Sequence, residues 1–185
     1  MAPRGVSGFS LVEVMIGATI GSFVLLGVLS TFLMLGRSGV NLNSYTAMEA
    51  QTRRALEDFA EDVRMSSNIT FNSTSSITLT VIDNYTTTSN QVTYAWDTTP
   101  GSSTFHYFYR VPGTSAATSP KTLYVANVTS FTFSRFDRLN SAATTDAGTK
   151  RIQITMTVST ANQTVVTATD TTISASYLLR NKTSS

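Results

Sequence analysis

The sequence predicts an α+β fold in which one long N-terminal helix packs part of its length against an antiparallel β-sheet. A charge-free apolar run extends from Val14 to Gly36, and an apolar stripe with helical spacing continues to about Ser66. After Asn68 the pattern changes to alternating apolar and polar residues, which is typical of strands. The chain has 185 residues, which suits one compact domain with an extension.

The apolar run is long enough to cross a membrane. It contains 23 residues without a charge, VMIGATIGSFVLLGVLSTFLMLG, and a bilayer core needs roughly 20 apolar residues in a helix. The alternatives are a buried helix of a soluble core and a secretory signal, whose apolar region is shorter, about 7–15 residues, and ends at a cleavage site. Because this run continues directly into more helix, we expect residues 9–37 to span a membrane. Residues 1–8 would then be a short leader with one basic side chain, Arg4.

The helix is expected to continue as an amphipathic segment from about residue 38 to residue 66. Apolar side chains recur there at intervals of three, four or seven, namely Tyr45, Met48, Ala55, Leu56, Phe59 and Val63. The charged residues between Glu49 and Arg64 lie mostly off this stripe. An unbroken helix over residues 9–66 is roughly 85 Å long at about 1.5 Å per residue. One domain cannot cover that length, so the first half must lie in lipid or between other subunits.

The rest of the chain is predicted to form the sheet that covers the helical stripe. Rows of alternating apolar residues mark its strands: Ile77, Leu79 and Val81; Val92, Tyr94 and Trp96; Phe105, Tyr107 and Tyr109; Phe131 and Phe133; and Ile152, Ile154, Met156 and Val158. Turn-rich breaks are expected at residues 83–90, 98–103, 112–120 and 140–149. A threonine-rich segment, residues 165–179, should end the sheet, so that residues 38–185 form one globular domain.

The composition excludes several kinds of site. The chain has no cysteine, which rules out a disulfide scaffold, a zinc site with thiolate ligands and a cysteine nucleophile. Its single histidine, His106, rules out a His-rich metal site and is expected on the outer face of a strand. No paired carboxylates, phosphate-binding glycine loop or nucleophile constellation is visible. We therefore expect no catalytic residues, no enzyme activity, no cofactor and no bound metal.

The aromatic and basic residues of the C-terminal part have structural interpretations. The aromatic side chains between Phe105 and Phe136 are expected in the sheet core rather than on a ligand surface. Four cations could form a small basic patch: Arg135, Arg138, Lys150 and Arg151. Without a binding motif, and with a net charge of only +2, this patch does not predict DNA binding.

The junction of leader and apolar run reads Gly8-Phe9-Ser10-Leu11-Val12-Glu13. It resembles the class III signal of type IV pilins and type II secretion pseudopilins, in which a short basic leader ends in Gly-Phe and one carboxylate lies in an otherwise apolar helix. The resemblance implies the type IV pilin fold and cleavage by a prepilin peptidase between Gly8 and Phe9. It also implies N-methylation of Phe9, a filament-core helix over residues 9–37, and a role in filament assembly for Glu13.

The physical chemistry of Glu13 agrees with that role. An acidic side chain in a membrane helix costs a few kcal/mol at the bilayer centre and less near the interface. In a filament, the free amine of Phe9 in a neighbouring subunit can pair with this carboxylate in a low-dielectric bundle and fix the axial register between subunits. The alternative is an interfacial carboxylate that simply reaches the water of the headgroup region.

Longer stretches narrow the resemblance to PilW-like minor pilins and, more loosely, to J-type minor pseudopilins of type II secretion. These stretches are GFSLVEVMIGATIGSFVLLGVLSTFL, QTRRALEDFAEDVRMSS, NVTSFTFSRFD, RIQITMTVS and YLLRN. Abundant pilins carry a helix-kinking proline where this chain has Ser30, and many close a C-terminal loop with a disulfide that this chain cannot form. Both departures favour a minor subunit. Because filament-capping subunits typically lack the carboxylate, Glu13 argues against the extreme tip position.

The resemblance implies a single-pass protein of the bacterial inner membrane that later enters a periplasmic or extracellular filament. Its expected partners are the prepilin peptidase, other pilins or pseudopilins in a helical filament, the inner-membrane assembly platform and the lipid bilayer. Three hypotheses stay open. The chain is a minor pilin that contributes to pilus assembly, adhesion or motility, a pseudopilus subunit of type II secretion, or a membrane-anchored binding domain that keeps its leader.

Overall fold

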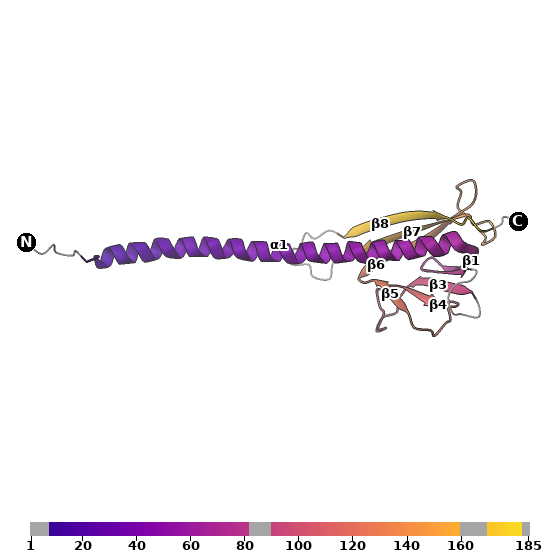
Figure 1. Cartoon of the computed structure of the whole chain (residues 1–185), viewed down its shortest axis with the longest axis horizontal. Coiled ribbons are helices and arrows are strands. Elements are labelled where there is room, and N and C mark those ends of the chain that lie inside the picture. The colour runs from indigo at the N-terminus through magenta and orange to yellow at the C-terminus, as the bar shows by residue number, and fades with distance from the viewer. Residues whose placement is uncertain (1–7, 82–89, 160–169, 183–185) are drawn as a thin grey trace, which may run out of the picture. The chain divides into compact units, whose positions relative to one another are not determined.

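The computed structural model describes residues 8–81, 90–159 and 170–182, and it confirms the α+β class. One helix, α1 (Leu11–Met65), is followed by strands only within this part of the chain (Figure 1). The chain divides into two compact units, Met1–Leu42 and Asn43–Ser185, and α1 contributes to both.

In the first unit, α1 is an apolar helix that is long enough to cross a membrane. Its large side chains are exposed around the helix; Phe23, for example, is 75% exposed. The hydroxyl groups of Thr19, Ser22 and Thr31 each donate a hydrogen bond to a carbonyl oxygen four residues earlier, at 2.8–3.0 Å. The few polar side chains of the run can thus be satisfied within the helix, as a lipid environment requires.

The second unit contains two antiparallel sheets where a single sheet was expected. The first has the order β1 (Ser66–Ser73), β2 (Ser76–Val81), β3 (Gln91–Trp96), β4 (Phe108–Pro112) and β5 (Thr122–Val125). The second has the order β6 (Val128–Phe136), β7 (Arg151–Val158) and β8 (Thr171–Leu178). Backbone bonds join them: Phe133 N donates to Thr74 O at 2.6 Å, and Val128 N donates to His106 O at 2.9 Å.

Most of the predicted strand rows are confirmed. The clearest is β7, in which Ile152, Ile154, Met156 and Val158 are buried and the residues between them are half-buried. The predicted last strand, residues 165–179, is confirmed over residues 171–178 by β8. Residues 165–169 of that segment lie outside the described residues, as do residues 83–89 of the first predicted break. β1 and β5 were not predicted.

The predicted row through Phe105, Tyr107 and Tyr109 is wrong in its first half. Phe105 and His106 lie in turns before β4, and the φ angle of His106 is 64°, which is incompatible with a strand. β4 therefore begins at Phe108, and the side chain of Phe108 is fully buried whereas those of Tyr107 and Tyr109 are half-buried. His106 is not a strand residue; its ring stacks on Phe105, with 3.8 Å between the ring centroids.

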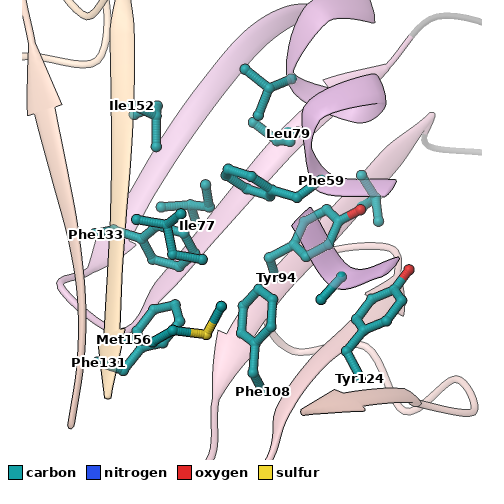
Figure 2. Packing of buried hydrophobic residues seen from close by; sticks show 14 of the residues in the cluster. Phe59, Ile77, Leu79, Tyr94, Phe108, Tyr124, Phe131, Phe133, Ile152 and Met156 are labelled. Atoms are coloured by element: carbon teal, nitrogen blue, oxygen red, sulfur yellow. The ribbon is translucent and has the colours of Figure 1, made fainter. Parts of the chain in front are cut away.

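Phe59 of α1 packs against both sheets in one shared core (Figure 2). It is completely buried, and its ring lies 5.0 Å from that of Tyr94 in the first sheet. It also lies 5.8 Å from Phe133 and 5.4 Å from Tyr177, both in the second sheet. Ala55 and Val63, one helical turn away on either side, are completely buried too, which confirms the predicted stripe.

The same helix is held to the first sheet by carboxylates that the sequence pattern placed off the stripe. Asp62 is only 4% exposed, so that expectation is wrong for it. Its carboxylate accepts hydrogen bonds from the hydroxyl of Tyr94 at 2.7 Å and from Nε of Arg110 at 3.0 Å. One turn earlier, Asp58 accepts a bond from the hydroxyl of Tyr124 at 2.7 Å. Burial and these carboxylates raise the pKa of both tyrosines above its ordinary value.

Candidate functional site

The junction between the leader and α1 is an exposed, non-helical segment. Gly8, Phe9 and Ser10 precede the first helical residue, and the side chain of Phe9 is 87% exposed. A Cβ atom built on Gly8 would meet nothing within 4 Å. The peptide bond between Gly8 and Phe9 is therefore accessible, as cleavage by a peptidase requires.

Ser10 and Glu13 start the helix together by a reciprocal arrangement. The backbone N–H of Ser10 donates to Oε2 of Glu13 at 3.0 Å, and the Ser10 hydroxyl donates to the same oxygen at 3.1 Å. In return, the backbone N–H of Glu13 donates to the Ser10 hydroxyl oxygen at 3.2 Å. This is a capping box, which satisfies backbone donors that the helix itself leaves unpaired. A carboxylate in the first turn is also stabilised by the helix dipole.

The capping box is a structural role of Glu13 that the sequence analysis missed. The signal was present, because Ser-x-x-Glu before an apolar run is the sequence pattern of a capping box. Both capping bonds to Glu13 use Oε2, and a carboxylate accepts through two oxygens. No basic side chain of the described chain forms an ion pair with Glu13. The structure thus brings Gly8, Phe9 and Glu13 together at one helix end and leaves Oε1 available to a further donor.

In the structure, one residue of the predicted basic patch, Arg135, is separate from the other three. Arg135 pairs with the carboxylate of Asp146 and donates to the carbonyl oxygen of Thr144 at 2.8 Å. The remaining three members, Arg138, Lys150 and Arg151, line one pocket at the start of β7. Within the described ranges, no group of three or more His, Cys, Asp or Glu side chains is arranged to hold a metal ion.

Comparison with protein families gives a match on the N-terminal segment. Residues 3–29 match the family model of the prokaryotic N-terminal methylation motif. The match includes the Gly8–Phe9 junction, Glu13 and more than half of the apolar run. No curated protein matches the chain.

Proposed function

We propose that this chain, which carries the methylation motif of a type IV pilin-like or pseudopilin precursor, is a minor pilin that assembles through α1 into a type IV pilus. The motif implies processing by a prepilin peptidase, and we assign the cut to the bond between Gly8 and Phe9 and the methylated amine to Phe9. One observation carries the proposal: within the matched residues, an accessible Gly-Phe junction lies just before Glu13, the one charged residue between Phe9 and Gly36.

Cleavage creates the partner that Glu13 lacks. The new amine at Phe9 is a cation next to the helix start, and the N-methylated amine keeps that charge. One oxygen of Glu13 is engaged in capping, and the other can accept from the amine of a neighbouring subunit. Burying both charges in a low-dielectric helix bundle is costly, and their pairing offsets that cost. The pair can form only when the two neighbouring helices have one particular axial alignment. The pair would therefore align adjacent helices along the filament axis.

The apolar half of α1 supplies the rest of the assembly surface. The described residues bury none of its most apolar stretch. Before assembly this surface fits a lipid bilayer, and afterwards it fits the helices of other subunits. The methylation motif of the chain is that of a structural subunit. The apolar residues of α1 therefore support a role in assembly.

The decisive experiment is mass analysis of the native protein extracted from membranes, in strains with and without the prepilin peptidase. We expect a chain that begins at N-methylated Phe9 only when the peptidase is present. Gly8→Val should block processing, whereas Gly5→Val, the same change within the leader, should not. A chain that begins at Met1 or Ala2 in both strains would refute the proposal and favour a membrane-anchored binding domain.

A pseudopilus subunit of type II secretion would show the same processing, since its precursors share the motif. Deletion of the gene separates the two machines. Loss of surface pili with normal protein secretion supports the minor pilin, and loss of secretion with normal pili supports the pseudopilin.

A further inference from the structure

We infer that the pocket at the start of β7, which we call the basic pocket, binds a carboxylate side chain presented by another protein subunit. The pocket has a volume of about 730 Å³ and is lined by three cations, Arg138, Lys150 and Arg151, together with Asp137 and Leu178. The surface belongs wholly to the second unit. The identification of the partner as a filament subunit rests on the proposed function. The binding of a carboxylate is argued from the pocket itself and does not depend on that function.

The described residues offset only part of the positive charge of the pocket. Asp137 is its one acidic residue, and Oδ1 of that side chain accepts the backbone N–H groups of Leu139 and Ser141, each at 2.8 Å. These bonds shape the loop that carries Arg138. Over the described residues, neither Asp137 nor any other carboxylate forms an ion pair with the three cations. The basic pocket therefore keeps a net positive charge.

Arg151 is fixed in place but forms no ion pair with a described residue. Its guanidinium lies over the ring of Phe136, 4.3 Å from the ring centroid, a contact that holds the group in one orientation. Its Nε is buried and has no hydrogen-bond acceptor in the described structure. A buried donor without an acceptor is destabilising. A carboxylate that binds the guanidinium would supply the missing negative charge, in the geometry that arginine recognises best.

Lys150 is also held with donors to spare. Its ammonium group donates to the carbonyl oxygen of Lys182, which anchors the lysine to the C-terminal segment. An ammonium group has three N–H donors, so that contact leaves two for a ligand. Arg138 is exposed and has no partner among the described side chains. Each of the three cations thus keeps N–H donors that no described group uses, which suits capture of an anion from solution.

The surroundings favour a protein carboxylate over the phosphates of a nucleic acid. Leu178, which lines the pocket and is 58% exposed, places apolar surface beside the cations. Arginine beside apolar surface is typical of protein interfaces. Nucleic-acid backbones are instead followed by longer basic grooves with open aromatic rings. Here Arg135 is already paired and the ring of Phe136 is covered by Arg151. The best ligand is an acidic residue between apolar neighbours.

The test is calorimetric titration of the full chain, in a nonionic detergent at low ionic strength, with defined probes. The probes are a blocked Leu-Glu-Leu peptide, its Leu-Gln-Leu counterpart and a single-stranded oligothymidylate. We expect the Glu peptide to bind about tenfold more tightly than the Gln peptide, the effect of one charge-assisted contact. Arg138→Gln and Arg151→Gln should each weaken binding about tenfold.

The matched control is Arg54→Gln, which removes the same charge from an exposed position of α1 outside the basic pocket and should change binding less than about twofold. Thermal unfolding of each variant checks that the fold is intact. Equal binding of both peptides, absence of binding, or equal loss in the control would overturn the inference. Tighter binding of oligothymidylate, lost in Arg138→Gln, would assign the pocket to nucleic acid instead. Because the titration needs neither processing nor a filament, its failure would leave the proposed function untouched.

Discussion

Asp62 is a buried carboxylate between α1 and the first sheet, and its replacement by alanine tests how the helix is held. The change removes the acceptor of two hydrogen bonds, one from the Tyr94 hydroxyl at 2.7 Å and one from Nε of Arg110 at 3.0 Å. Tyr94 is completely buried, and the side chain of Arg110 is only 18% exposed. Both groups would therefore lose this acceptor in a place that water reaches poorly.

The expected loss is large. Removal of one partner of a buried ion pair costs about 3–5 kcal/mol of unfolding free energy. Because Arg110 keeps some contact with solvent, we expect the lower end, about 3 kcal/mol. For a domain of this size each kcal/mol corresponds to about 2–4 °C in the melting temperature. Asp62→Ala should thus lower the melting temperature by about 6–12 °C. The melting temperature is measured by near-ultraviolet circular dichroism of the full chain in detergent.

Two variants make the test specific. Glu61→Ala removes the neighbouring, exposed carboxylate and should change the unfolding free energy by less than about 0.5 kcal/mol. Asp62→Ala combined with Arg110→Met removes both charges and should recover a large part of the loss, because no buried cation then lacks its counterion. If Asp62→Ala lost no more than Glu61→Ala, the buried pair would not hold the helix. A double variant less stable than Asp62→Ala would contradict the electrostatic explanation.

Three further predictions follow from the contacts described. Glu13→Gln keeps a side-chain oxygen for the Ser10 N–H but loses the charge, so processing should be normal while incorporation into sheared filaments falls about tenfold; equal incorporation on immunoblots would contradict the pairing role. The raised pKa values of Tyr94 and Tyr124 mean that the unfolded chain loses these protons first, near the ordinary value of 10.0. The contribution of these two tyrosines to stability should be constant below that pH and fall above it, by at most about 1.4 kcal/mol per pH unit for each tyrosine, and denaturant titration of Tyr124→Phe should show a shallower fall. Phe59→Ala should cost about 3–5 kcal/mol and unfold both sheets in one transition; two separate transitions by circular dichroism would show that the sheets are independent.

The helix and the strongest strands were predictable because their periodicity follows directly from burial on one face. β1 and β5 were not, for different reasons. β1 follows α1 without a break and is mostly polar, with Ile69 its only fully buried apolar residue. β5 has only four residues, two of them exposed. The division into two sheets depends on contacts distant in sequence, such as the bond between Phe133 and Thr74, which no local pattern records.

At the N-terminus the sequence predicts candidate site residues, and the structure adds the geometry of the helix start. Gly8, Phe9 and Glu13 were proposed from the order of residue types, whereas the bonds between Ser10 and Glu13 were missed although Ser-x-x-Glu is the pattern of a capping box. Asp62 was placed on the wrong face because charged residues are expected to be exposed. Its partners, Tyr94 and Arg110, are 32 and 48 residues away. Sequence spacing cannot show that a buried charge has found such partners.

The anchors of α1 in the second unit also determine how this subunit would respond to mechanical load. Asp58, Phe59 and Asp62 lie within about 6 Å of helix rise, and each contacts a strand. A pull along the helix axis would stretch these attachments side by side instead of one after another. They would have to rupture almost together, which makes slippage of the helix a steep, cooperative event. A subunit built in this way transmits tension up to a threshold without gradual yielding.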